Sequence, residues 1–149
     1  PRPTNSDGGF PNSYLFYAIM KKILLIMTAS LLTACGNNFD ERLKDEAEQL
    51  TKKHCPQQVD DITTLDSVVY DMERRTYVRY FTLAADAVPM AKENRLAVKA
   101  TLTDELKNDA SWKRVKDEKI NFEYVYRDAS NGTLAFTIRL EPADYQARR

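Results

Sequence analysis

Cysteine and histidine are scarce in this sequence, which holds two cysteines and one histidine among 149 residues. A structural zinc site or an iron–sulfur cluster draws three or four ligands from these residue types. We therefore expect no metal centre and no bound cofactor. Glycine and proline are also few, at four and six residues, so the composition does not indicate a long flexible arm of low complexity.

The chain has no excess of either charge, with 22 basic and 22 acidic residues. Nucleic-acid binding needs a surface rich in lysine and arginine, so this balance argues against nucleic acid as a partner. No nucleophile elbow, phosphate-binding loop or zinc-protease motif occurs in the sequence. Its hydrophobic content of 43% and its charged content of 30% are typical of one globular domain.

Residues 20–34 have the pattern of a secretory signal peptide. Met20 is followed by Lys21 and Lys22, and an apolar run then extends from residue 23 to residue 32. This run is too short to cross a bilayer as a helix. We interpret residues 1–19, which precede the signal, as an upstream extension that is not part of the fold.

The signal ends in Leu32-Thr33-Ala34-Cys35, which resembles the lipobox of bacterial lipoproteins. The resemblance implies that cleavage follows Ala34, that Cys35 carries fatty acyl chains such as palmitate, and that residues 35–38 form a short tether. Two or three acyl chains anchor a protein stably to a membrane. Gly36 after the lipidated cysteine favours the outer membrane by family analogy, so we expect a lipid-anchored protein of the cell envelope.

The sequence after the tether begins with a helical pattern. Residues 39–54 form one apolar stripe at intervals of four, four and three, which consists of Phe39, Leu43, Ala47 and Leu50. Pro56 does not allow the helix to continue. Residues 64–70 and 76–83 are rich in threonine, valine and aromatic residues, which predicts two strands joined in a hairpin.

A polar helical region follows over residues 88–117. Residues 120–126 and 134–140 alternate between apolar and polar side chains, and Asn131-Gly132 between them suits a tight turn. The order α-β-β-α-β-β predicts an α+β fold with a four-stranded antiparallel sheet and helices packed on one face. We expect one such domain over residues 39–145.

His54 and Cys55 are the most suggestive chemical pair in the sequence. A thiolate activated by a histidine is the nucleophile of several enzyme classes. Cys55, however, follows the C-terminal end of the expected helix, where the partial negative charge raises a thiol pKa. We therefore favour a packed Cys55. A thiol-dependent enzyme or redox protein using Cys55 with His54 stays as the alternative.

Aromatic side chains are frequent in the first expected hairpin. Strand alternation puts Tyr77 and Phe81 on one side of their strand and Tyr80 on the other. One side has to meet the helices, so part of this set belongs to the core. If both sides are aromatic, the open face is a binding surface, and its candidate residues are Tyr77, Phe81 and Tyr80.

Residues 54–60, with residues 64–68 and 77–83, resemble small uncharacterised lipoproteins of Bacteroidetes-type bacteria. The resemblance implies no catalytic residue. We expect a membrane-anchored envelope lipoprotein that serves as a non-catalytic binding module, with an envelope protein as its partner. A binder of small ligands or glycans is a further alternative.

Overall fold

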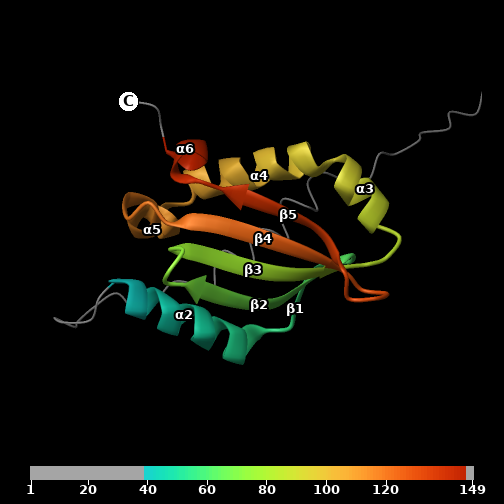
Figure 1. Cartoon of the computed structure of the whole chain (residues 1–149), viewed down its shortest axis with the longest axis horizontal. Helices are drawn as coiled ribbons and strands as arrows, with labels where there is room; N and C mark the ends of the chain where they lie inside the picture. Colours follow the sequence, from blue (N-terminus) through green and yellow to red (C-terminus); the bar gives the residue numbers. More distant parts are fainter. Residues whose placement is uncertain (1–38, 147–149) are drawn as a thin grey trace, which may run out of the picture.

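The computed structural model describes residues 39–146, which form one five-stranded sheet with helices (Figure 1). The expected signal peptide, lipidation site and tether lie outside these residues. The strand order in the sheet follows the sequence. The strands are β1 (Gln57–Asp60), β2 (Thr63–Asp71), β3 (Thr76–Leu83), β4 (Asn121–Asp128) and β5 (Leu134–Leu140).

The α+β class is confirmed, but the sheet has five strands instead of four. The additional strand is β1, a short edge strand that pairs with β2. The sheet is also not wholly antiparallel, because β3 and β4 run parallel over their full length. The helical segments between them return the chain to the end of the sheet where β3 began, as a parallel pair requires. These segments are α3 (Val88–Glu93), α4 (Arg95–Asn108), η2 (Ala110–Trp112) and α5 (Lys113–Asp117).

Helix α2 (Phe39–His54) has the bounds that its apolar stripe and Pro56 predicted. It buries Leu43 and Ala47 against the sheet and lies along β2. Its Thr51 hydroxyl donates to the Val68 carbonyl and accepts from the Val68 N–H, both at 2.7 Å. Because β1 pairs only with the first half of β2, the helix satisfies backbone groups that would otherwise be exposed at a sheet edge.

The C-terminal end of α4 is fixed by a lysine from α5. Lys116 Nζ donates to the carbonyls of Leu106, Lys107 and Asp109 at 2.8, 3.0 and 3.0 Å. These carbonyls have no partner within the helix, so the lysine satisfies them and complements the helix dipole. The last helix is α6 (Pro142–Tyr145), and its Tyr145 hydroxyl donates to the Ile120 carbonyl at 2.6 Å.

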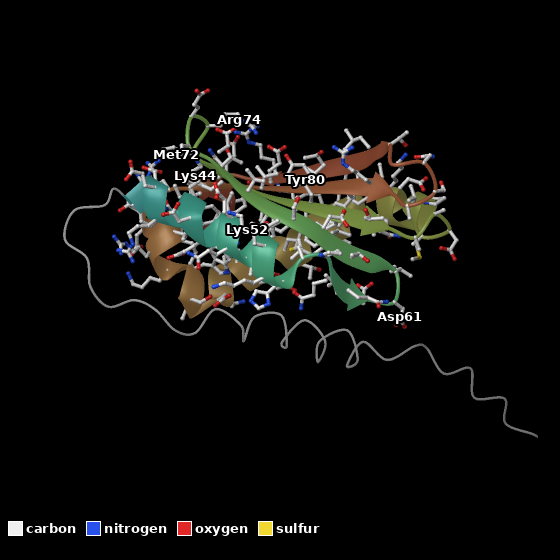
Figure 2. All side chains as sticks on the ribbon, turned by 90° about the horizontal axis from the view of Figure 1, so that it is seen from below. Lys44, Lys52, Asp61, Met72, Arg74 and Tyr80 are labelled. Atoms are coloured by element: carbon white, nitrogen blue, oxygen red, sulfur yellow. The ribbon has the colours of Figure 1, made fainter. Side chains whose placement is uncertain are left out.

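The helices pack on one face of the sheet, which we call the inner face (Figure 2). Most of the buried aromatic residues belong to the core on this face. It is lined by the buried side chains of Leu65, Val68, Tyr70, Tyr77, Phe81, Phe122, Tyr124, Tyr126, Phe136, Ile138 and Leu140. Alternation placed Leu134 on this face too, but its side chain is 58% exposed. A register shift opposite Tyr126 and Arg127 ends the regular alternation just before Leu134.

Candidate binding site

The structure separates the three residues that the sequence selected as a partner surface. Tyr77 is 1% exposed and Phe81 is 8% exposed, and both lie on the inner face. Phe81 stacks on Tyr126 with ring centroids 5.1 Å apart. Tyr80 is half-buried and points to the other face, which we call the outer face (Figure 2). Tyr77 and Phe81 are therefore core residues, and only Tyr80 remains available to a partner.

The outer face around Tyr80 is mostly polar. Thr82 donates to the Asp66 carboxylate across the β2–β3 pair at 2.7 Å. Val69 is its clearest apolar feature, with 45% of the residue exposed. Single exposed apolar residues are normal on a protein surface. The outer face therefore lacks the aromatic character on which the expected partner surface depended.

The inner face holds one charged residue at its centre, Arg79 of β3. A cross-strand row runs through Val68, Arg79, Tyr124 and Ile138. The three neighbours of the arginine are at most 4% exposed. Arg79 itself is half-buried, and burial of a charge is costly to the extent that the charge is neither paired nor hydrogen-bonded. An arginine at this position therefore calls for a specific explanation.

Aromatic rings surround the Arg79 guanidinium. Its central carbon lies 5.1 Å from the Trp112 ring, 5.7 Å from the Tyr77 ring and 5.8 Å from the Tyr124 ring. Arginine is weakly hydrated and stacks well on such faces, and cation–π contacts lower the cost of its burial. Within residues 39–146, the hydrogen bonds and ion pairs formed by arginines belong to Arg74, Arg75, Arg127 and Arg139. Among residues 39–146, the Arg79 guanidinium has aromatic rings as neighbours, and no carboxylate oxygen lies within 4 Å of its nitrogen atoms.

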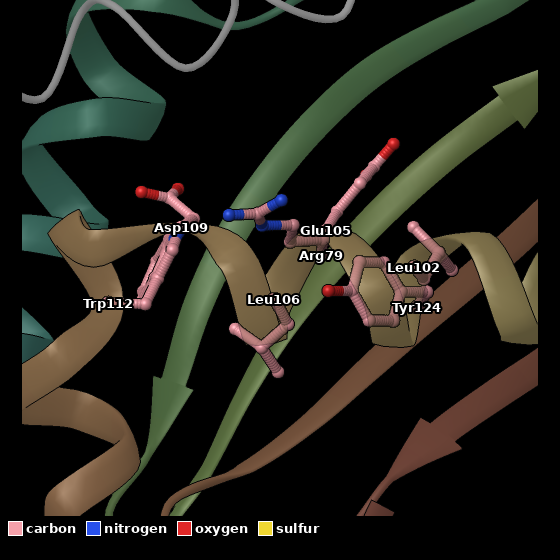
Figure 3. A pocket seen from close by; sticks show the side chains of 7 residues that line it. All are labelled: Arg79, Leu102, Glu105, Leu106, Asp109, Trp112 and Tyr124. Carbon is pink, nitrogen blue, oxygen red and sulfur yellow. The ribbon is translucent and has the colours of Figure 1, made fainter. Parts of the chain in front are cut away.

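A cavity of about 30 Å³ lies between this arginine and α4 (Figure 3). Positions 102, 105, 106 and 109 follow the three-and-four spacing of one helix face, so α4 supplies one wall and the sheet supplies the other. Figure 3 shows the Arg79 guanidinium pointing toward Asp109 and Trp112. The lining residues are Arg79, Leu102, Glu105, Leu106, Asp109, Trp112 and Tyr124.

Two polar atoms of this region are buried without a hydrogen-bond partner. Asp109 Oδ1 accepts from the Ser111 N–H at 2.8 Å and from its hydroxyl at 2.7 Å, so one carboxylate oxygen caps η2. The second oxygen, Oδ2, and the Tyr77 hydroxyl have no partner. A buried unpaired polar atom costs about 1–3 kcal/mol. Both atoms are enclosed by the protein, and Tyr77 does not line the cavity.

Glu105 is the second acid of the cavity. Burial raises the pKa of its carboxyl above the ordinary range, and the nearby Arg79 charge opposes that rise. The lining thus carries one cationic and two acidic side chains, which are separated by a gap. Such a lining is suited to binding a polar group, since the residues that form it include no nucleophile beside a base.

Cys55 follows the C-terminal end of α2, directly after His54. Its backbone N–H donates to the Thr51 carbonyl at 3.1 Å, so the residue continues the last turn of the helix. Burial raises the pKa of the Cys55 thiol, and the Asp66 charge raises it further. His54 is exposed. A raised thiol pKa opposes the formation of a thiolate, so the geometry favours packing over nucleophilic chemistry at Cys55.

Sequence reasoning missed Arg79, Glu105 and Asp109. The signal for Arg79 was present, because strand alternation puts it on the same side as Tyr77 and Phe81. What the sequence did not show was which side faced the helices. For the two acids, the helical spacing that aligns them with Leu102 and Leu106 was readable once α4 was bounded.

Two further features of residues 39–146 concern metal binding and membrane crossing. In this part of the chain, no cluster of three or more His, Cys, Asp or Glu side chains is arranged to hold a metal ion. None of its helices combines the length and the apolar character needed to cross a membrane.

Comparison with known families gives a match over most of the fold. Residues 38–136 match the model of a family described as a domain of unknown function, DUF8479. The chain belongs to this family. The match extends from the start of α2 into β5 and includes every residue that lines the cavity. No curated protein matches the chain.

Solved structures share the fold at low sequence identity. A Pseudomonas aeruginosa protein assigned as secreted is 13% identical and superposes with a TM-score of 0.60, covering 74% of this chain and all of that one. The pilotin EpsS of the Vibrio vulnificus type II secretion system is 15% identical, with a TM-score of 0.56 and coverage of 75% and 100%. The type II secretion pilotin AspS of Vibrio cholerae is 13% identical, with a TM-score of 0.52 and coverage of 70% and 90%.

Proposed function

We propose that this protein is lipidated at Cys35, resides in the cell envelope at the outer membrane, and binds an envelope protein without catalysing a reaction. The observation that carries the binding role is the Arg79 guanidinium, which lies beside a cavity on the inner face and forms no ion pair within residues 39–146. The likeness to two pilotins of type II secretion systems supports an envelope assembly as the setting.

The geometry disfavours the other functions that the sequence left open. A cavity of about 30 Å³ is far smaller than the roughly 300–1,000 Å³ of ordinary small-molecule pockets. It is suited to the end of one side chain of a protein partner, and a sugar ring would not fit. The raised pKa of Cys55 argues against a thiol enzyme.

The test is site-specific photo-crosslinking in the native envelope of a producing cell. A photoreactive phenylalanine analogue replaces Leu102 at the cavity, Tyr80 on the outer face, or Arg139 as an exposed control on β5. We expect one envelope protein to be captured from position 102, and little or none from position 139. The same protein should be captured when Cys55→Ser is added.

Each remaining result has a defined meaning. Capture from position 80 alone would move the binding site to the outer face. An absence of any reproducible capture, or loss of capture with Cys55→Ser, would overturn the binding-module proposal. Cys35→Ala tests the anchor separately: the unlipidated variant should leave the membrane fraction, and normal membrane retention would contradict lipidation at Cys35.

A further inference from the structure

We infer that one end of the domain binds the phospholipid headgroups of the membrane and thereby fixes how the protein stands on the bilayer. This end, which we call the tether end, consists of residues 39–42, 71–75 and 113–121 (Figure 1). Arg75 joins the three segments: its side chain lies 3.1 Å from Asp40 and 3.6 Å from Glu118, and its carbonyl accepts from the Asn121 N–H at 3.0 Å. The inference rests on the proposed lipidation at Cys35 and adds the surface that meets the bilayer.

The length of chain between the lipid and the domain holds the tether end at the membrane. Residues 36–38 separate Cys35 from Phe39, which is the first residue of α2. The four steps from residue 35 to residue 39 span at most about 14 Å when extended. Helix α2 has 16 residues, so its length alone is about 24 Å. An acylated Cys35 therefore keeps the start of α2 at the bilayer surface, whereas the opposite end of the domain is free to point away.

The side chains at the start of α2 are suited to a headgroup layer. The Arg114 guanidinium lies 5.2 Å from the centroid of the Phe39 ring. Arg114 is exposed, and the nearby Asp117 pairs with Lys113 at 2.6 Å instead. Among residues 39–146, Arg114 takes part in no ion pair, so its donors are available to a phosphate group. The ring beside it supplies the apolar part of an interfacial contact.

The charges of the domain favour the same orientation. The tether end has seven basic and six acidic residues. The opposite end, which we call the far end, consists of residues 60–62, 84–96 and 128–133 and has two basic and five acidic residues. Its segments are joined by backbone hydrogen bonds from Ala84 to Ile62 and from Ala129 to Leu83. A bilayer with anionic lipids attracts the basic groups of the tether end and repels the acidic far end.

Exposed apolar residues occur at both ends and provide a matched pair of probes. Met72 lies in the β2–β3 turn of the tether end and is 38% exposed, and Figure 2 shows it close to the start of α2. Leu96 lies at the far end and is 78% exposed. If apolar exposure alone decided which end meets lipid, Leu96 would be the better contact. The tether and the charges predict the opposite.

The test is photo-crosslinking of the full-length, lipidated protein in vesicles of phosphatidylethanolamine and phosphatidylglycerol. A photoreactive phenylalanine analogue replaces Met72 or Leu96, and mass spectrometry of the intact protein measures the yield of phospholipid adducts. We expect the yield from position 72 to exceed the yield from position 96 by at least about fivefold.

A pair of double variants tests the role of the basic residues. Lys113→Gln combined with Arg114→Gln should lower the adduct yield from position 72 by about fivefold or more, because it removes two charges that face the headgroups. Lys52→Gln combined with Lys53→Gln removes the same charge from the exposed C-terminal turn of α2 and should leave the yield unchanged. An equal effect of the two double variants would contradict headgroup binding by Lys113 and Arg114.

The remaining results separate this inference from the proposed function. Equal yields from both positions, a higher yield from position 96, or no adduct from position 72 would overturn the inference while the anchor stays in place. A purified protein without acyl mass on Cys35 would overturn the proposed lipidation and the inference together. Capture of an envelope protein from position 102 tests the binding function independently of either result.

Discussion

Two polar clusters lie beside β3. The first is near the start of the strand and consists of Asp40, Tyr70 and Arg75. The second is farther along and consists of Tyr77, Arg79 and Asp109. The first, which we call the brace cluster, is fully connected. Asp40 accepts from the Tyr70 hydroxyl and from Arg75 Nε, the latter at 3.1 Å. Arg75 also lies 3.6 Å from the Glu118 carboxylate.

The second cluster, which we call the cavity cluster, uses the same residue types without pairing them. Its arginine faces rings, its tyrosine hydroxyl has no partner, and one oxygen of its aspartate is unused. The brace cluster joins the N-terminal end of α2 to the β2–β3 hairpin, which is a structural role. The cavity cluster has no comparable pairing, and it is where we propose that a partner binds.

The largest expected effect comes from removing the ring that supports Arg79. Trp112 is 5% exposed, and its ring centroid lies 5.1 Å from that of Tyr77 and 5.4 Å from that of Phe122. Trp112→Ala should lower the free energy of unfolding by about 3–5 kcal/mol, because it leaves a large hole and strands the guanidinium. Urea denaturation followed by circular dichroism measures this change.

Met72 supplies the control for the tryptophan variant. It lies in the turn after β2 beside the brace cluster and is 38% exposed. Met72→Ala should change the free energy of unfolding by less than about 0.5 kcal/mol. A loss of under about 1 kcal/mol for Trp112→Ala would show that the cavity cluster is loosely packed. The unpaired state of Arg79 would then carry no functional meaning.

The elements of the fold followed from local patterns wherever such patterns were strong. The stripe from Phe39 to Leu50 and the stop at Pro56 gave α2 its observed bounds, and the alternation in residues 134–140 gave those of β5. The four-residue strand β1 was not predicted, because it is too short to show an alternation of apolar and polar side chains. The parallel pairing of β3 with β4 depends on the path of the crossover, which no local pattern determines.

The candidate site was harder to predict for a related reason. Both sides of β3 carry aromatic residues, with Tyr77 and Phe81 on one side and Tyr80 on the other, so composition did not reveal the inner face. An arginine in such a strand would ordinarily be assigned to the solvent side. Only the pairing of Arg79 with the buried Val68 and Tyr124 places the charge among core residues.

Replacing Arg75 by methionine should lower the free energy of unfolding, whereas replacing Arg79 by methionine should leave it unchanged or raise it. Arg75→Met removes ion pairs to Asp40 and Glu118, and because these side chains are partly exposed the loss should be about 1 kcal/mol or less. Arg79→Met keeps a long side chain among the rings and removes a half-buried charge that has no ion pair. It should leave the free energy of unfolding unchanged or raise it by up to about 2 kcal/mol.

Each of the two arginine variants serves as the control for the other in the same series of urea denaturation experiments. A double variant should show additive changes, because the brace and cavity clusters share no hydrogen bond among residues 39–146. Destabilisation by Arg79→Met as large as that by Arg75→Met would contradict the comparison. It would show that Arg79 is already satisfied, for example by ordered water in the cavity.

Removal of either tyrosine hydroxyl should change the free energy of unfolding by no more than about 1 kcal/mol. Tyr70→Phe removes the donor to Asp40 and should cost about 1 kcal/mol. Tyr77→Phe removes a buried hydroxyl without a partner, so the free energy of unfolding at pH 7 should stay the same or rise by up to about 1 kcal/mol. Both variants keep the ring, and therefore the aromatic contacts, so the difference between them isolates the hydroxyl groups.

Alkaline pH sharpens this last comparison. Burial raises the pKa of Tyr77 from 10.0 to about 12. Below pH 10 the phenol is protonated in both states, whereas between pH 10 and 12 the unfolded chain releases the proton and the folded chain keeps it. Stability therefore falls as the pH rises through this window, by up to about 1.4 kcal/mol per pH unit for one group. Tyr77→Phe should make that fall less steep. An unchanged slope would mean that the Tyr77 hydroxyl ionises freely in the folded protein, and that the cavity cluster is open to water instead of being held ready for a ligand.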